Sequence, residues 1–191
     1  MAGLRIAVVP GDGIGVEVIR EATAVLEAVA AASGRTLTLT PFDWSAETYL
    51  ATGVSMPKDG LRMLSENFDA ILLGAMGDPR VPDNRHAVDI LLGMRFGLDL
   101  YVNHRPVRLL DPRLCPLKGV EAKDVDFVVF RENTEGLYVM MGGNFKRDTP
   151  DEVATDIDLN TRKGVERIIR HAFQFARATG RKRLVMSDKS N

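Results

Sequence analysis

The sequence has a single cysteine, almost no net charge and no long apolar run, and each shortage narrows the class of protein. With Cys115 as the sole thiol, no internal disulfide can form, and we expect a reducing, cytoplasmic compartment. A formal net charge of −1 gives no indication of a surface for nucleic acid or an anionic membrane, and we expect neither as a partner. No apolar run reaches the roughly 20 residues that cross a bilayer. Met1 leads directly into a strand pattern, so we also expect no signal peptide.

The first half of the chain alternates short apolar runs with helical patterns. Runs at 4–9, 36–42 and 70–73 predict buried strands, and an apolar stripe over 18–29 predicts a helix. This alternation indicates an α/β fold with a mainly parallel sheet, whose functional groups gather at the carboxyl ends of the strands. The glycines after the first run follow a G-x-G-x-G spacing, which differs from the dinucleotide fingerprint, so we do not assign them to a pyrophosphate.

The second half has fewer helical patterns. Residues 88–96 and 161–178 are expected to be helical, and strands are expected at 98–102, 125–130 and 184–186. The polar stretch that ends at Asp158 is long for a loop in a compact domain, and from the chain alone we interpret it as a loop or hairpin. His104 is interpreted as a residue that packs or hydrogen-bonds locally.

Three arginines in separate segments are the strongest sign of chemistry. Guanidinium groups such as those of Arg95, Arg105 and Arg131 bind carboxylates or phosphates bidentately and stay charged at any working pH. Tyr138 and Lys189 belong to the same stretch of the chain, Leu91 to Lys189, and can transfer protons if their site shifts their pKa values toward neutrality. Spacing alone leaves open the alternative that these arginines form surface ion pairs.

Five phrases in a fixed order carry a family resemblance: VVPGDGIGVEV, MRFGLDLYVNHRPV, FRENTEGLYVMMGG, GVERIIRHAF and SDKSN. Together they resemble the β-decarboxylating dehydrogenases, which include isopropylmalate, isocitrate, homoisocitrate and tartrate dehydrogenases. The resemblance runs from Arg5 to Asn191. It implies an isopropylmalate dehydrogenase-like α/β fold, with a parallel or mixed sheet and flanking helices, that is incomplete at the C-terminus.

The resemblance also implies a domain plan. Residues 1–99 correspond to the first half of the large α/β domain, and residues 100–191 to an incomplete central domain for dimerisation and substrate binding. A clasp arm at about 137–158 is expected to hold a second subunit in a homodimer.

By the same resemblance, the substrate is a small 2-hydroxy dicarboxylate of the malate type. Arg95, Arg105 and Arg131 are expected to bind its carboxylates, Lys189 to act as base for the 2-hydroxyl, and Tyr138 to protonate the carbon that loses CO₂.

By the resemblance, the segment just before Arg95 is expected to meet the variable arm of the substrate. The apolar pair Leu91 and Leu92 resembles the isopropylmalate type, in which an alkyl group is buried. Val88 stands where the isopropylmalate enzymes typically carry a glutamate, so a tartrate-like or other malate derivative stays open.

The resemblance implies NAD as hydride acceptor, with NADP possible, and Mg²⁺ or Mn²⁺ as metal. The expected cofactor-binding residues are Ile14, Gly74, Ala75, Asp89 and Asn191. The alternative for the segment 74–89 is a flexible surface loop, because it is rich in turn-forming residues.

Metal ligands are expected beyond residue 191, and none is assigned within the chain. Asp12, Asp78 and Asp188 do not match the metal positions of the family. A different class of function is therefore kept as an alternative: a non-catalytic fragment, or a regulatory or interaction subunit that lacks metal ligands.

Overall fold

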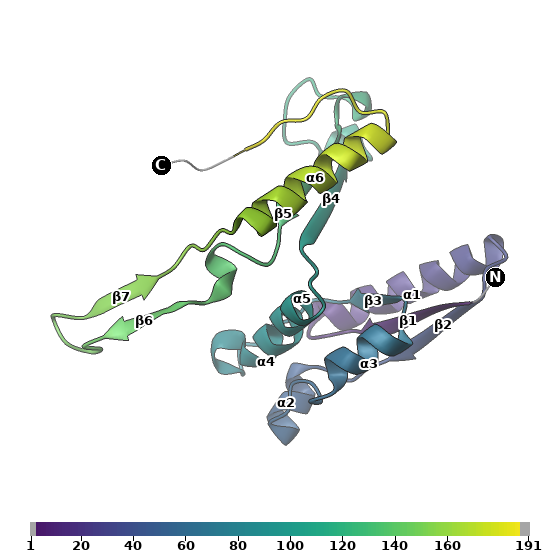
Figure 1. Ribbon diagram of the computed structural model, residues 1–191. Helices are drawn as coiled ribbons and strands as arrows, with labels where there is room; N and C mark the ends of the chain where they lie inside the picture. Colours follow the sequence, from purple (N-terminus) through teal and green to yellow (C-terminus); the bar gives the residue numbers. More distant parts are fainter. Residues whose placement is uncertain (1–2, 188–191) are drawn as a thin grey trace. The chain divides into compact units, whose positions relative to one another are not determined.

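A computed structural model describes residues 3–187, and the chain forms two compact units, Met1–Asp99 and Leu100–Asn191 (Figure 1). Each unit has its own sheet, and we take them separately.

The first unit is built on a parallel sheet of three strands in the order β2-β1-β3. Its strands are β1 (Leu4–Val9), β2 (Leu37–Pro41) and β3 (Ala70–Leu73), and its longer helices are α1 (Ile14–Ala32), α2 (Ala46–Thr52) and α3 (Gly60–Asn67). Parallel strands require crossover connections, and the right-handed rule puts α1 and α3 on opposite faces of the sheet (Figure 1). The predicted parallel sheet is confirmed.

The core of this unit lies on the α3 face. Ala7 and Val9 of β1 pack with Leu64 of α3 and with residues of a later helical segment; the whole cluster comprises Ala7, Val9, Trp44, Leu64, Ile90 and Met94. The helix α1 forms where its apolar stripe predicts it, but only Ile19 of that stripe is buried. Val25 and Val29 are 62% and 58% exposed, so this unit covers the stripe only in part.

The later helical segment joins three short pieces. It consists of α4 (Arg85–Ala87), a π-helical turn η2 (Val88–Leu92) and α5 (Gly93–Gly97), preceded by the 3-10 turn η1 (Pro82–Asn84). Residues 88–96 are helical as predicted. A π-turn widens the helix locally, and such turns are frequent at functional sites.

The second unit is built on a two-stranded antiparallel ribbon. Strands β4 (Val102–Arg108) and β5 (Asp126–Glu132) pair in register from Val102 opposite Glu132 to Arg108 opposite Asp126. The helix α6 (Arg162–Ala178) packs on one face of this ribbon (Figure 1). The remaining elements are the hairpin β6 (Gly142–Phe145) and β7 (Val153–Asp156) and the 3-10 turns η3 (Pro112–Leu114), η4 (Ala122–Asp124) and η5 (Leu137–Val139).

Two predicted strands are wrong. Residues 98–101 do not form a strand, because the last turn of α5 continues through Leu98 and Asp99: the Leu98 N–H donates to the Met94 carbonyl, and Asp99 has a left-handed φ of 47°. The strand begins at Val102 and runs to Arg108. Residues 184–186 also form no strand, since nothing in the described part of the chain pairs with them.

Candidate active site

The ribbon of the second unit gathers two of the predicted arginines. The β4–β5 register sets Asn103 directly opposite Arg131, so both side chains lie on the same face. Side chains alternate along a strand, which brings Arg105 and Asn133 to this face as well. The Arg105 Nε donates to the Asn103 Oδ1 at 2.6 Å, and an Arg131 terminal nitrogen donates to the Asn133 Oδ1 at 3.2 Å.

The two asparagines also bind each other and the backbone. The Asn103 amide nitrogen donates to the Asn133 Oδ1 at 3.4 Å, and the Asn133 amide nitrogen donates to the Leu100 carbonyl at 3.2 Å. Asn133 is 8% exposed, and its backbone N–H donates to the Tyr101 carbonyl at 3.0 Å. A neutral amide bridge of Asn103 and Asn133 therefore connects the two guanidinium groups.

Tyr138 joins this cluster. It lies in η5, and the Arg131 guanidinium carbon is 5.4 Å from the centre of its ring, within the range of a cation–π contact. The structure thus brings together Arg105, Arg131 and Tyr138, which were predicted as site residues from three separate positions. We call these residues with Asn103 and Asn133 the arginine cluster.

The charge of the cluster sets it apart from those arginines of the unit that pair with carboxylates. Arg108, Arg113, Arg167, Arg170 and Arg181 each contact a carboxylate. Within residues 3–187, no ion pair involves Arg105 or Arg131, whose partners are neutral amides. An amide orients a guanidinium without cancelling its charge, so this face of the ribbon stays positive and fits an anionic substrate.

The two glutamates of the FRENTEGLY motif, Glu132 and Glu135, bind on the other face of the ribbon, where α6 packs. The Glu132 carboxylate accepts hydrogen bonds from the N–H and the hydroxyl of Thr134. It also forms an ion pair at 3.2 Å with Arg167 of α6. The Glu135 carboxylate accepts the Thr161 N–H at 2.7 Å, at the start of α6. These carboxylates anchor the helix and leave the arginine cluster unneutralised.

The pKa of Glu132 provides a test of this anchoring. Burial raises its pKa, but the hydrogen bonds from Thr134, Glu135 and Arg167 together outweigh burial, so the pKa lies below its ordinary value of 4.5. A carboxyl with a lowered pKa contributes stability that is complete above its unfolded pKa and is lost as the pH falls through the folded one.

We therefore expect Glu132→Gln to flatten the acid dependence of stability. The free energy of unfolding of the unchanged protein should fall more between pH 5 and pH 3 than that of the variant, measured by urea titration. An equal fall in both proteins would mean that Glu132 does not carry the acid sensitivity.

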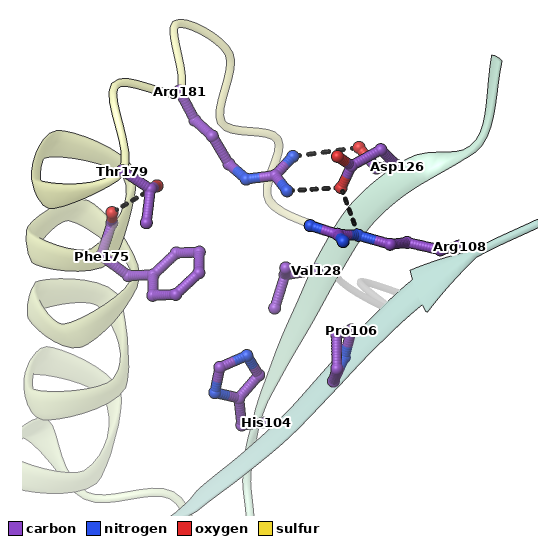
Figure 2. Close-up of a pocket in the computed structure, with 8 residues that line it drawn as sticks. All are labelled: His104, Pro106, Arg108, Asp126, Val128, Phe175, Thr179 and Arg181. Carbon is purple, nitrogen blue, oxygen red and sulfur yellow. Dashed lines mark hydrogen bonds and ion pairs between the residues drawn. The ribbon is translucent and has the colours of Figure 1, made fainter. Parts of the chain in front are cut away.

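The α6 face of the ribbon holds a cavity of about 480 Å³ (Figure 2). Figure 2 shows Asp126 between Arg181 and Arg108, so the two cations share one carboxylate and one positive charge remains, and the Arg181 guanidinium lowers the pKa of Asp126. His104 packs in the same cavity, with its ring 4.9 Å from Phe130 and 5.3 Å from Phe175, which confirms the packing interpretation. Because a carboxylate offsets one of its two cations, this cavity is a poorer match for a dianion than the arginine cluster, whose two guanidinium groups hydrogen-bond to neutral amides.

The first unit carries the other predicted substrate residues on its last helical segment. Leu91 and Leu92 belong to the π-turn η2, and Arg95 follows on α5. Leu91 is 37% exposed, while Leu92 and Arg95 are half-buried. The apolar pair and the arginine therefore lie within one turn of each other on the same segment.

The predicted cofactor residues of this unit lie mainly at the carboxyl edge of the parallel sheet. Ile14 starts α1 directly after the β1–α1 turn and is 62% exposed. Gly74 and Ala75 follow β3, and a Cβ on Gly74 would lie 2.0 Å from the Pro10 carbonyl oxygen. The two loops therefore touch backbone to backbone, which brings Ile14, Gly74 and Ala75 to one edge. Asp89 is on η2, where its carboxylate accepts a 2.8 Å hydrogen bond from the Ser55 hydroxyl.

Sequence reasoning missed a buried acid–base pair at this edge. Asp12 is 7% exposed and His86 is 0% exposed, and the His86 Nε2 lies 2.7 Å from the Asp12 carboxylate. Burial raises the pKa of Asp12, but hydrogen bonds from Ala46, His86 and Gly77 outweigh it, and the pKa lies below its usual range. The signal for Asp12 was its position between two glycines after a strand; nothing in the sequence singled out His86.

Lys189 and Asn191, predicted as base and cofactor ligand, lie outside the described residues. In residues 3–187, no three His, Cys, Asp or Glu side chains are grouped so that they could hold a metal ion. The described part of the chain also contains no helix with the length and apolarity of a membrane span.

The chain belongs to the isocitrate/isopropylmalate dehydrogenase family, whose sequence pattern matches residues 5–191. This membership confirms the predicted family and fold.

Named relatives agree with this assignment. A 3-isopropylmalate dehydrogenase of Thermobifida fusca is 45% identical over 98% of this chain and 53% of its own length. A decarboxylating D-malate dehydrogenase of Escherichia coli is 46% identical over 100% of this chain and 53% of its own. The crystal structure of isocitrate dehydrogenase from Methylococcus capsulatus superposes with a TM-score of 0.74 at 32% identity, covering 94% of this chain and 49% of that one. The chain spans about half the length of the curated relatives it matches.

Proposed function

We propose that this chain belongs to an enzyme that oxidatively decarboxylates a 2-hydroxy dicarboxylate of the malate type, with NAD or NADP as hydride acceptor. A 3-isopropylmalate-like or tartrate-like acid is the expected substrate. The proposal is supported by the family, by the names of the relatives and by the chemistry of the arginine cluster.

The observation that carries the proposal is a pair of arginines that have no carboxylate partner within residues 3–187. Arg105 and Arg131 extend from adjacent strands, and amides fix them while their charges stay uncompensated. Two guanidinium groups held in this way are preorganised for a dianion and need no rearrangement when it binds. The Tyr138 ring lies beside the Arg131 guanidinium, which supports the proposal that its phenol protonates a carbon of the bound acid.

The other roles complete this hypothesis. Arg95 is expected to bind a further carboxylate oxygen, and Leu91 and Leu92 to contact the variable arm of the substrate. Lys189 is expected to remove the proton of the 2-hydroxyl as hydride leaves C2, the carbon that bears this hydroxyl. Loss of CO₂ then leaves an enolate, which Tyr138 protonates.

The described residues fit the cofactor better than the metal. The edge formed by Ile14, Gly74 and Ala75 is lined by backbone and small or apolar side chains, a surface suited to a flat nicotinamide ring. When bound, the dinucleotide supplies the hydride acceptor. Residues 3–187 offer no matching set of metal ligands, so Mg²⁺ or Mn²⁺ dependence stays a prediction that rests on ligands elsewhere, and no step here depends on the ion.

A substrate panel tests the proposal. Purified protein is incubated with NAD⁺ or NADP⁺, Mg²⁺ or Mn²⁺, and 3-isopropylmalate, tartrate, malate or isocitrate in turn, and reduced cofactor is followed by absorbance. We expect activity that needs the metal and prefers one malate-type acid. Absence of turnover and of binding for every acid would favour the non-catalytic or regulatory alternative. The homodimer and the clasp arm at about 137–158, which contains the β6–β7 hairpin, are tested by the molar mass of the protein in solution.

A further inference from the structure

One buried carboxylate joins the segments that follow all three strands of the parallel sheet. Asp12 accepts the Ala46 N–H at 2.6 Å with Oδ1 and the Gly77 N–H at 2.8 Å with Oδ2. His86 approaches the same Oδ2 at 2.7 Å. Ala46 comes after β2 and Gly77 after β3, so a side chain in the β1–α1 turn connects three loops at the carboxyl edge.

The His86 ring has a fixed orientation, with its Nε2 directed at the Asp12 carboxylate. A carboxylate only accepts hydrogen bonds, so the imidazole donates through Nε2. The ring is fully buried and stacks on Tyr49 of α2, with ring centres 6.0 Å apart and planes at 28°. Its Nδ1 is buried without a hydrogen-bond partner among the described residues. Stacking and the bond to Asp12 therefore fix the orientation of the imidazole.

Asp12 also binds the loop after β3, which is the segment proposed to receive the nicotinamide. The Asp12 N–H donates to the Ala75 carbonyl at 2.7 Å, so both the backbone and the side chain of Asp12 bind the loop after β3. That loop is Gly74-Ala75-Met76-Gly77, and its two glycines give its backbone unusual freedom in the absence of such bonds. Its conformation therefore depends on the polar contacts with Asp12.

We propose that Asp12 and His86 are positioning residues: together they fix residues 74–77 in the conformation that receives the cofactor, without touching the cofactor themselves. The cofactor part of this inference rests on the proposed function. The fixing of the loop does not, because it is a property of the chain alone.

Two substitutions at His86 separate the hydrogen bond from the packing. In His86→Gln the side-chain amide nitrogen reaches the position of Nε2 and keeps a donor for Asp12. In His86→Phe a ring of similar shape still stacks on Tyr49 but donates nothing. Leu64→Val is the matched control, because Leu64 is 2% exposed in the core cluster of the same unit, which includes neither Asp12 nor His86.

Two measurements are made on each protein: amide hydrogen exchange at Ala46 and Gly77, and the dissociation constant for NAD⁺ by calorimetry. His86→Phe should speed exchange at both amides by about tenfold or more relative to the amides of β1, since the Asp12 carboxylate loses its orienting partner. It should weaken NAD⁺ binding by a similar factor, about tenfold. His86→Gln should stay within about twofold of the unchanged protein in both respects, and Leu64→Val should lower stability without selectively exposing these amides.

Each result that differs from these expectations overturns a particular part of the proposal. Unchanged exchange at Gly77 in His86→Phe would overturn the fixing of the loop, whatever the cofactor does. Exchange in His86→Gln as fast as in His86→Phe would overturn the hydrogen bond as the sufficient cause, because a donor to Asp12 without the imidazole ring would then fail to hold the segment. Faster exchange with unchanged NAD⁺ affinity would overturn the positioning role. If the unchanged protein binds no NAD⁺, the proposed function fails, and the exchange comparison still decides whether the pair fixes the loop.

Discussion

Replacing Arg131 by alanine is expected to lower kcat/KM for the dicarboxylate by on the order of 10²- to 10³-fold, within the roughly 2–5 kcal/mol that truncating one partner of a desolvated charge pair costs. The reason is the position of Arg131 in the arginine cluster. Its guanidinium hydrogen-bonds to the amide of Asn133 and lies over the ring of Tyr138, so its removal takes away a charge and the cation–π contact of the phenol. Steady-state kinetics on the preferred acid measures the loss.

Two further variants sharpen this test. Arg113→Ala is the matched control, because the Arg113 side chain is 88% exposed and pairs with Asp111, away from the cluster, and it should leave kcat/KM unchanged. Arg131→Lys keeps a positive charge but cannot make bidentate contacts, so an intermediate loss is expected. If Arg131→Ala turned over every malate-type acid as fast as the unchanged protein, the arginine cluster would not be the substrate site.

Replacing Tyr138 by phenylalanine is expected to lower kcat by roughly 10²- to 10⁴-fold, the usual contribution of a positioned general acid, with little change in KM. Phenylalanine keeps a ring under the Arg131 guanidinium and removes only the hydroxyl. Substrate binding should therefore persist while protonation of the enolate slows. Rapid-mixing experiments that follow cofactor reduction and CO₂ release separately measure which step is affected.

The chain offers a close control for this variant. Tyr101 also packs its ring against an arginine, with the Arg167 guanidinium carbon 4.4 Å from the ring centre, but on the α6 side of the second unit. Tyr101→Phe should leave kcat within about twofold, since the ring–cation contact does not depend on the hydroxyl. Equal kcat values for Tyr138→Phe and the unchanged protein would assign the proton to another donor.

Much of the fold follows from local patterns. The helix expected over 161–178 is α6 (Arg162–Ala178), because its apolar spacing, the Thr161 cap and Gly180 all agree. The strand expected at 98–102 failed because an apolar run of that length is compatible with either a strand or the end of a helix, and the last turn of α5 continues into it. The strand expected at 184–186 failed because a strand requires a neighbouring strand, which no local pattern supplies.

The site divides in the same way. Arg105, Arg131 and Tyr138 could be selected from the sequence, because their residue types and phrases are distinctive. The Asn103–Asn133 bridge could not, since it depends on the register of β4 against β5. The Asp12–His86 pair joins residues 74 positions apart through a fully buried contact, and neither residue type reveals its partner in advance.

The alternation along β5 and the turn after it has a consequence for how this chain tolerates mutation. The side chains at the odd positions 131 and 133 belong to the arginine cluster. Those at the even positions 132 and 134 accept hydrogen bonds from Arg167 of α6 and so fix that helix. A saturation library scored for both activity and cellular abundance should therefore show a repeat of two residues here. Substitutions at 131 leave abundance intact while activity falls, and substitutions at 132 and 134 lower abundance first. Neighbouring residues of a single motif would then be under two independent selective pressures, one on chemistry and one on folding.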